Sequence, residues 1–238
     1  FIMLSRVFRN EFKRNFNLVV AMTKNNGIGI NNRLPWKISD HPEDMKSFVK
    51  ITSTVSDSSK KNSVIMGSKT WESIPDKFKP LKNRLNIILS KNLKQSDIGN
   101  NNNINILPSI DDAILFLNSK ENKNIIENNY VIGGTSIYSQ FLNSNYQHYI
   151  DKIYTTVINK DYNADCYFPK ITKNFVAIDK KILSDNATLN IYQNKSNLNS
   201  QEYNYLNCLH HVLNNGEYVM DRTKTGTLSV PHQQISFD

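Results

Sequence analysis

Short apolar runs alternate with amphipathic stretches along most of this chain, and this alternation predicts its fold class. Runs such as Val64-Ile65-Met66 are typical of strands that are buried on both faces of a sheet. The turn sequence Ser184-Asp185-Asn186 predicts a hairpin between the last two strands. The predicted strands cover residues 17–22, 63–66, 85–89, 104–107, 130–132, 152–158, 175–183 and 189–193. Eight strands that alternate with helices favour an α/β fold with one substantial sheet.

Helical spacing of apolar residues predicts helices over residues 42–52, 68–73, 110–118 and 135–143. In the first of these, Met45, Phe48, Val49 and Thr52 define a predicted buried face. Asp44 lies at the edge of that face, one turn before Phe48. Its carboxylate either bends toward water as an ordinary surface charge or lies in a pocket with hydrogen-bond partners, where it can exchange a proton.

Three predicted strands end in sequences suited to an anionic ligand. Consecutive glycines let the backbone approach a ligand closely, and a helix N-terminus offers free N–H groups to an anion. The three junctions are Met66-Gly67-Ser68-Lys69-Thr70-Trp71, Leu89-Ser90-Lys91 and Ile132-Gly133-Gly134-Thr135-Ser136. None has the spacing of a Rossmann fingerprint. The carboxyl ends of strands are nevertheless where α/β sheets hold phosphorylated cofactors.

Residues 26–36, directly after the first predicted strand, are rich in glycine and asparagine. This composition predicts a tight loop, in which Gly27 and Gly29 supply conformational freedom. Leu34-Pro35-Trp36 adds an apolar surface and one indole N–H. A plain strand-to-helix connection would have the same composition, so this segment alone does not identify a site.

The composition narrows the class of partner. The chain has 238 residues, of which 39% are hydrophobic, so it is able to bury a core. Its 29 Lys and Arg against 21 Asp and Glu give a net charge of +8, which fits anionic partners. The cations are spread along the chain, and no run of 18 apolar residues occurs. We therefore predict neither a nucleic-acid nor a membrane partner.

The two cysteines, Cys166 and Cys208, have no CxxC spacing, which argues against a disulfide framework or a zinc cluster. We predict that both are buried small residues in a protein of a reducing, cytoplasmic compartment. His41, His148 and His232 have no partner at ligand spacing, so we predict no metal site.

The length predicts one domain with a smaller appended segment. We predict a lead-in over residues 1–16, a main domain over 17–194, an Asn- and Ser-rich linker over 195–200 and the appended segment over 201–238. In that segment we predict a helix over 202–214, a polar loop over 221–227 and a following strand. The first residue is Phe1 rather than Met, which indicates a fragment or a mis-started gene model.

The motifs that carry a family resemblance are Val20-Ala21, Gly27-Ile28-Gly29, Leu34-Pro35-Trp36, Asp44-Met45-Lys46, Val64-Ile65-Met66-Gly67, Thr70-Trp71-Glu72-Ser73-Ile74-Pro75, Pro80-Leu81-Lys82-Asn83-Arg84 and Ile132-Gly133-Gly134. In order and spacing they resemble dihydrofolate reductase over about residues 17–195. The tail, with Asp221-Arg222-Thr223 and Thr225-Gly226-Thr227, is similar to the opening of thymidylate synthase. Such a chain resembles the bifunctional enzyme of protozoa, truncated early in the synthase domain.

This resemblance implies a dihydrofolate reductase-like fold: a central eight-stranded, mostly parallel sheet with flanking helices and a C-terminal hairpin, plus a partial α/β synthase segment. It implies NADPH-dependent reduction of 7,8-dihydrofolate to 5,6,7,8-tetrahydrofolate. In the intact chain this would be coupled to a synthase that converts dUMP to dTMP. The implied partners are dihydrofolate and antifolate inhibitors. The intact protein would be a homodimer through the synthase domain, and this fragment a monomer.

The resemblance also implies the residues of the substrate site. Asp44 would hydrogen-bond the pterin and promote its protonation at N5, with Trp36 and Thr156 supporting it as the other catalytic residues. Arg84 would hold the α-carboxylate of the glutamate tail, for which its planar fork is suited. The other implied substrate contacts are Val19, Val20, Met45, Phe48, Ile74, Ile132 and Tyr138.

For the cofactor, Ser90 and Lys91 match the 2′-phosphate site, and Arg222 in the tail matches a residue that binds the dUMP phosphate. Ser68 stands where the family commonly has a cation, which leaves the preference for NADPH over NADH open. The implied NADPH contacts are Ala21, Ile28, Gly29, Gly67, Ser68, Lys69, Thr70, Leu89, Ser90, Lys91, Gly133, Gly134, Thr135, Ser136 and Ile137.

Two further readings stay open. One is a reductase of the same fold that acts on a pterin-like or riboflavin-precursor substrate. The pairing of Asp44 with Arg84 argues against it, because together they suit a pterin that bears a glutamate. The other is an inactive copy of the enzyme, which Ser68 and the shortened tail would fit.

Overall fold

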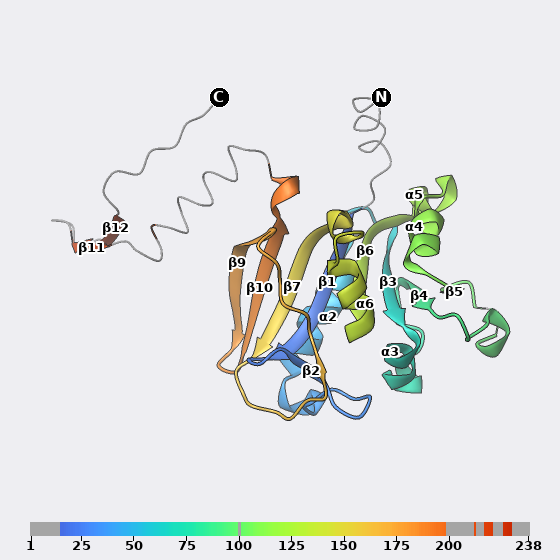
Figure 1. Cartoon of the computed structure of the whole chain (residues 1–238), viewed down its shortest axis with the longest axis horizontal. Coiled ribbons are helices and arrows are strands. Elements are labelled where there is room, and N and C mark those ends of the chain that lie inside the picture. Colours follow the sequence, from blue (N-terminus) through green and yellow to red (C-terminus); the bar gives the residue numbers. More distant parts are fainter. Residues whose placement is uncertain (1–14, 100, 199–211, 213–216, 221–225, 230–238) are drawn as a thin grey trace.

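Eight strands form one sheet, in the order β5-β4-β3-β6-β1-β7-β10-β9 (Figure 1). The computed structural model describes residues 15–99, 101–198, 212, 217–220 and 226–229. The sheet strands are β1 (Phe16–Thr23), β3 (Lys61–Gly67), β4 (Arg84–Leu89), β5 (Ile104–Leu107), β6 (Ile126–Gly133), β7 (Ile150–Ile158), β9 (Phe175–Ser184) and β10 (Ala187–Asn194). Neighbours from β5 to β7 pair in parallel, and β10 pairs antiparallel with both β7 and β9. The predicted mostly parallel sheet and its C-terminal hairpin are confirmed.

Helices cover both faces of this sheet. On one face, α2 (Pro42–Ser53) and α3 (Ser68–Ser73) pack with Val19 of β1. On the other face, α4 (Ile110–Asn118) and α6 (Thr135–Leu142) pack with Leu18 and Val20. Figure 1 shows α6 in front of the sheet and α2 behind it. Successive residues of β1 thus serve opposite layers, as the two-residue period of a strand requires.

The remaining elements are short. A fifth helix, α5 (Lys120–Ile125), was not predicted, because its sequence Lys-Glu-Asn-Lys-Asn-Ile has no apolar stripe. The single-turn 3₁₀ helices are η1 (Ile38–Asp40), η2 (Asp76–Phe78), η3 (Gln95–Asp97), η4 (Gln147–Tyr149) and η5 (Lys195–Asn197). No helix of the described ranges is long and apolar enough to cross a membrane.

The glycine-rich loop differs from its prediction. Gly27–Gly29 forms a strand, β2, which pairs with β8 (Cys166–Tyr167). The left-handed conformations of the segment belong to asparagines, among them Asn26 with φ 62° and Asn31 with φ 50°. Gly27 is needed for close packing instead, because a Cβ there would lie 2.6 Å from the Cβ of Ala164. The sequence could not show this contact, since the two segments lie far apart along the chain.

Two predictions about burial were wrong in detail. Phe16, placed in the lead-in, is the first residue of β1 and is fully buried. Val49, placed on the buried face of α2, is 42% exposed, whereas Asp44 and Thr52 are buried. The buried stripe of α2 is therefore rotated toward Asp44, so that the carboxylate lies inside the protein.

In the appended segment the structure describes a hairpin of β11 (Glu217–Met220) and β12 (Gly226–Ser229). The strand predicted after the polar loop is present, but it begins at Gly226 rather than after residue 227. The predicted helix over 202–214 lies outside the described residues except for Val212, which is helical. Arg222 and Cys208 also lie outside them.

Candidate active site

Asp44 lies in the first turn of α2 and is only 5% exposed. Burial raises the pKa of its carboxyl group from the ordinary 3.8 to about 6, against the opposing effect of a hydrogen bond with the Thr156 side chain. Thr156 belongs to β7 and is itself buried. The Asp44 carboxyl group is therefore buried with a hydrogen-bond partner and is not an ordinary surface charge. A carboxyl group with such a pKa is able to hold and release a proton near neutral pH.

Two other predicted site residues are also buried. Trp36 is 5% exposed and packs with Ile158 and Ala187, at one end of β7 and β10. Tyr138 of α6 donates a hydrogen bond of 2.7 Å to the carbonyl oxygen of Val19. Burial, and secondarily the charge of Asp44, raise the pKa of the Tyr138 phenol, so it stays neutral. The helix on the other face of the sheet therefore also contributes to the surroundings of Asp44.

Arg84, the first residue of β4, is a buried cation with a prepared geometry. It is 6% exposed, and burial lowers the pKa of its guanidinium group. Its Nε donates to the Lys82 carbonyl oxygen at 2.9 Å and its Nη1 to the Thr52 hydroxyl at 2.8 Å. The guanidinium carbon lies 5.9 Å from the centroid of the Phe48 ring. Thr52 was not predicted as a site residue. Its contact with Arg84 joins α2 to β4, two elements that lie apart along the chain, so the sequence does not show it.

Three ion pairs occur in the described part of the chain: Lys60–Asp57, Lys79–Asp76 and Lys181–Asp179. None of them includes Arg84. A buried charge is costly without a counter-ion, and two of the guanidinium nitrogens are already oriented by the protein. The arrangement therefore favours binding of an external anion, of which a carboxylate fits the planar fork best.

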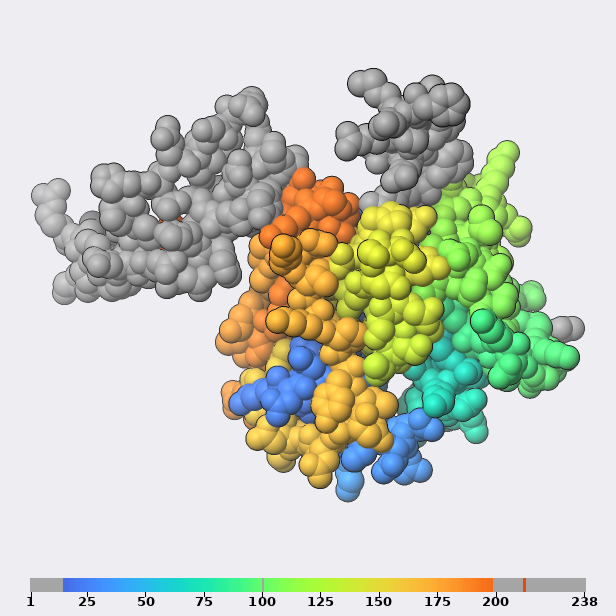
Figure 2. Space-filling view, in the orientation of Figure 1, coloured from blue at the N-terminus to red at the C-terminus, as the bar shows by residue number. Residues whose placement is uncertain are grey.

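The three predicted junctions lie side by side at the carboxyl edge of the sheet. Gly67 of β3 pairs with Leu89 of β4, and Met66 pairs with Gly133 of β6. The register thus brings together residues as far apart as Met66 and Gly133, 67 positions along the chain, because parallel strands end at the same edge. Figure 2 shows an opening near this edge, bounded by the segments of α6, α3 and β8.

Glycines let the backbones of these junctions approach their neighbours closely. A Cβ at Gly134 would lie 3.2 Å from the Thr70 hydroxyl oxygen, and one at Gly67 would lie 3.3 Å from Ile137. Gly133 has φ 120°, a conformation that favours glycine, and is joined to Gly134 by a cis peptide bond. No side chain caps the N-terminus of α6, which leaves its backbone N–H groups for an anion. The Thr135 hydroxyl oxygen is buried and has no hydrogen-bond partner in the described part of the protein.

The residues implied for the 2′-phosphate lie at the end of β4. The Ser90 hydroxyl oxygen accepts hydrogen bonds from the Leu93 and Asn92 N–H groups, at 3.0 and 3.3 Å. Its own hydrogen is left for a ligand, because a hydroxyl group both accepts and donates. Lys91 and Lys69 are exposed, and Ser68 is half-buried. Two exposed lysines, Lys69 and Lys91, therefore follow the carboxyl ends of β3 and β4, although Ser68 itself carries no charge.

The β2–β8 pair covers one side of this edge. The Asp165 carboxylate accepts a hydrogen bond of 2.8 Å from the Asn31 N–H group, and the Asp165 N–H group donates to Gly29 at 2.9 Å. Asp165 was missed because nothing in its local sequence marks it. Its neighbour Cys166 is exposed, so its predicted burial was wrong. Asp165 and partial burial raise the pKa of the Cys166 thiol, which argues against a reactive thiolate.

Most of the other predicted residues lie in one of the two apolar clusters on the faces of the sheet. Some implied substrate contacts gather in the cluster on the α2 and α3 face; these are Val19, Phe48, Ile74 and Ile132. Some implied contacts pack in or against the core on the opposite face; these are Val20, Ile28, Leu89 and Ile137. Ala21 packs beside Trp36, and Ser136 is exposed.

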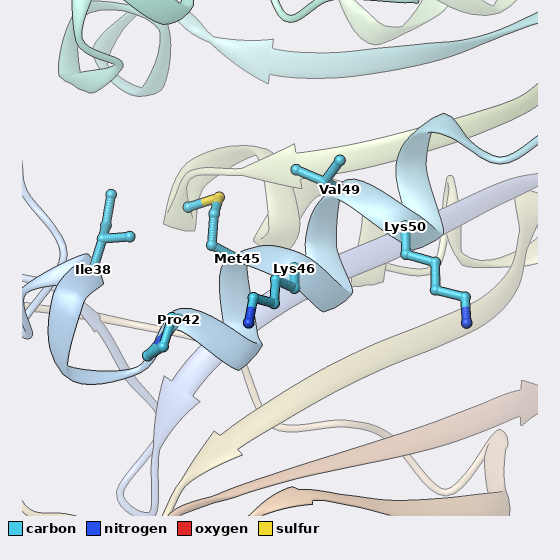
Figure 3. A pocket seen from close by; sticks show the side chains of 6 residues that line it. All are labelled: Ile38, Pro42, Met45, Lys46, Val49 and Lys50. Carbon is cyan, nitrogen blue, oxygen red and sulfur yellow. The ribbon is translucent and has the colours of Figure 1, made fainter.

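Met45 belongs to a separate groove of about 510 Å³ on α2. Figure 3 shows Ile38, Met45 and Val49 projecting on one side of the helix, with Lys46 and Lys50 on the other. The groove does not include Asp44, so we assign the chemistry to the buried carboxyl group rather than to this surface.

Among the residues that the structure describes, no group of three or more His, Cys, Asp or Glu side chains is placed to hold a metal ion.

The raised pKa of Asp44 predicts a pH-dependent cost in stability. Between about pH 4 and pH 6 the folded protein holds this proton more tightly than the unfolded chain does, so stability falls as the pH rises through that range. The whole difference corresponds to about 3 kcal/mol. We expect Asp44→Asn to be more stable than the unsubstituted protein at pH 7.5, by up to that amount, and to lose the advantage at pH 4. Urea unfolding at both pH values measures this, and an equal effect at both would contradict it.

The junctions that contain Gly67, Gly133 and Gly134 at the carboxyl edge of the sheet form a glycine-lined cradle, and Gly67→Val tests whether it binds the cofactor. The backbone of Gly67, with φ −79° and ψ 163°, is accessible to valine, so the substitution adds volume without backbone strain. Its Cβ would lie 3.3 Å from the side chain of Ile137, one of the residues implied to contact the cofactor, and would push against it. We expect the KM for NADPH to rise at least about tenfold, equivalent to about 1.4 kcal/mol. Ser139→Val, which places the same side chain at an exposed position of α6, is the matched control. Equal KM values for both variants would place the cofactor elsewhere.

The fold and the site together define an α/β enzyme class with a glycine-lined anion cradle and a buried, near-neutral carboxyl group at its sheet. The chain belongs to the dihydrofolate reductase family, whose model matches residues 15–199.

The relatives agree with this membership. A dihydrofolate reductase of Heliothis virescens is 38% identical, over 69% of this chain and 85% of its own length. The bifunctional dihydrofolate reductase-thymidylate synthase 1 of Arabidopsis thaliana is 35% identical, over 96% of this chain and 50% of its own length. A bifunctional enzyme of Plasmodium berghei is 40% identical, over 71% of this chain and 30% of its own length. The chain spans between 30% and 51% of the length of these and the other bifunctional relatives.

Proposed function

We propose that this chain catalyses the NADPH-dependent reduction of 7,8-dihydrofolate to 5,6,7,8-tetrahydrofolate. The observation that carries the proposal is the buried Asp44 carboxyl group, whose pKa is raised to about 6. Its relatives include proteins named dihydrofolate reductase from Heliothis virescens and Drosophila melanogaster.

In the proposed reaction, Asp44 binds the pterin ring and holds a proton near the atom that is to be protonated. Thr156 keeps the carboxyl group oriented, and burial of Asp44 keeps water away from it. A general acid works best when its pKa lies near the working pH, and a pKa of about 6 meets that condition where an ordinary aspartate would be fully ionised.

Arg84 binds the other end of the substrate. Its remaining N–H groups would hold the α-carboxylate of the glutamate tail, while Phe48, Ile74 and Ile132 of the neighbouring apolar cluster pack against the aromatic linker. A pterin that bears a glutamate satisfies both Asp44 and Arg84, which a riboflavin precursor does not.

The cradle at the carboxyl edge fits a phosphorylated cofactor. Gly67 and Gly134 lie where a Cβ would crowd Ile137 and Thr70, so the backbone there is not covered by side chains of its own, and the Thr135 hydroxyl group has no partner among the described residues. NADPH, when bound, supplies the hydride. We propose that Ser90 and Lys91 hold its 2′-phosphate, with Lys69 close to the same edge in place of a cation at residue 68.

The test is the rate of NADPH oxidation, with and without dihydrofolate, repeated with NADH. We expect oxidation that depends on dihydrofolate and is faster with NADPH. A folded protein without dihydrofolate-dependent oxidation would disprove the proposal and support an inactive copy. A reaction only with NADH would disprove the roles of Ser90 and Lys91.

The appended segment supports a second proposal, that the chain is part of a bifunctional reductase and thymidylate synthase. Relatives named bifunctional match 94–98% of this chain in plants and Paramecium tetraurelia, whereas the single reductases match 66–69%. We propose that Arg222 binds the dUMP phosphate and that the intact protein is a homodimer through its synthase domain. Antifolate binding, a monomeric fragment, a cytoplasmic location and the protozoan type remain predictions.

A further inference from the structure

His41 is a buried histidine that the proposed chemistry does not use. It directly precedes α2, three residues before Asp44, and is 4% exposed. Its Nε2 lies 2.8 Å from the hydroxyl oxygen of Tyr162, in the segment between β7 and β8. The two residues are 121 positions apart, so this hydrogen bond joins the start of α2 to a distant part of the chain.

The pair encloses Trp36. The ring centroids of His41 and Trp36 are 6.2 Å apart, and those of Tyr162 and Trp36 are 5.8 Å apart. The rings of His41 and Tyr162 are themselves 5.8 Å apart and nearly perpendicular, an edge-to-face arrangement that stabilises aromatic pairs. Since Trp36 also packs against Ile158 of β7, the three rings form one unit with the end of that strand.

Strand β7 and the residues that follow it make two contacts that hold Asp44 in place. Thr156 on β7 hydrogen-bonds the Asp44 carboxyl group. Six residues later, Tyr162 holds His41, whose carbonyl oxygen accepts the Asp44 N–H group at 3.2 Å. No side chain caps the N-terminus of α2, so its first turn is secured from outside the helix, by the His41–Tyr162 hydrogen bond at its start and by the bond of Thr156 to Asp44.

We propose that the His41–Tyr162 hydrogen bond is a tether that positions Asp44: it fixes the first turn of α2 so that the carboxyl group stays buried beside Thr156. His41 and Tyr162 are positioning residues in this role. The inference rests on the proposed function, in which Asp44 handles the proton. The titratable groups at the cluster are His41, Tyr162, Asp44 and Lys160, whose ammonium nitrogen lies 5.7 Å from the centroid of the Tyr162 ring.

Tyr162→Phe tests the tether, because it removes the hydroxyl group and keeps the ring. We expect kcat with dihydrofolate at pH 7 to fall about tenfold, with the apparent pKa of the pH profile moving toward the ordinary aspartate value, because a loosened carboxyl group is better solvated. The KM for NADPH should stay unchanged. His41→Phe should have the same effect, and His41→Gln, whose amide can still hydrogen-bond the phenol, should restore most of the activity.

Tyr146→Phe is the matched control, since it removes a phenol hydrogen bond of 3.0 Å to Asp111 on the far side of the fold. We expect it to leave kcat and the pH profile unchanged. If Tyr162→Phe lowers the melting temperature but leaves the pH profile in place, the contact is merely structural and the proposal is wrong. The same holds if both His41 variants behave alike.

A second measurement does not depend on activity. Asp44→Asn is introduced into the unsubstituted protein and into the Tyr162→Phe variant. In each background, the gain in the free energy of unfolding that Asp44→Asn causes is measured at pH 7.5 and at pH 4, and the difference between the two pH values is compared. If the tether keeps Asp44 buried, this gain shrinks in the Tyr162→Phe background. An unchanged gain overturns the tether even if the enzyme is active. A shrunken gain in a protein that does not oxidise NADPH supports the tether and disproves only the proposed function.

Discussion

Asp44→Asn is expected to lower kcat with dihydrofolate at pH 7 by about 10²-fold or more, the usual contribution of a positioned general acid. Asparagine keeps the shape and the hydrogen bond to Thr156 but has no proton to exchange. Because solvent protonates the substrate at low pH, part of the rate should return as the pH falls toward 5. Stopped-flow or steady-state rates from pH 5 to pH 9 measure this.

The stability of the Asp44→Asn variant provides the control, since it should be folded and, at neutral pH, more stable than the unsubstituted protein. A loss of activity in an unfolded variant would therefore be recognised. Wild-type turnover across the whole pH range would show that another group handles the proton.

Arg84→Met is expected to raise the KM for dihydrofolate by about 10- to 100-fold, because hydrogen bonds to a charged group contribute about 1.5–3 kcal/mol. The carboxylate lies far from the reacting atoms, so kcat should change little, as for any contact that is equally strong in the ground and transition states. Arg84→Lys keeps the charge but loses the fork held by Lys82 and Thr52, and should be intermediate.

A 7,8-dihydropterin without the glutamate tail is the matched control substrate for these variants. Its KM should be the same for Arg84→Met and for the unsubstituted protein, because no carboxylate reaches residue 84. If Arg84→Met affected both substrates equally, the guanidinium group would be supporting the fold of α2 and β4 rather than binding a ligand.

The four helices predicted in the main domain agree with α2, α3, α4 and α6 within one residue, and the sheet strands agree within two residues except β6, which begins four residues before its predicted start. The runs in β3 and β4 are continuous because both faces are covered, and the glycine-rich junctions mark where those strands end. These features depend on neighbours along the chain. α5 and the β2–β8 pair could not be recognised, because neither has a hydrophobic period of its own.

Some features of the candidate site could likewise be predicted from the sequence, and others depend on the fold. Its residue types and spacing were readable from the sequence and carry the family resemblance. The burial of Asp44, the exposure of Val49 and Cys166, and the isolation of the Arg84 charge were not.

The sequence by itself thus determined the fold class, the family and the identity of the candidate site residues. Only the tertiary structure decided that the Asp44 carboxyl group has a pKa near 6, and that His41 is held by Tyr162 across 121 residues. The physical reason is that a pKa depends on desolvation and on nearby charges, and both are set by segments that meet only when the chain has folded.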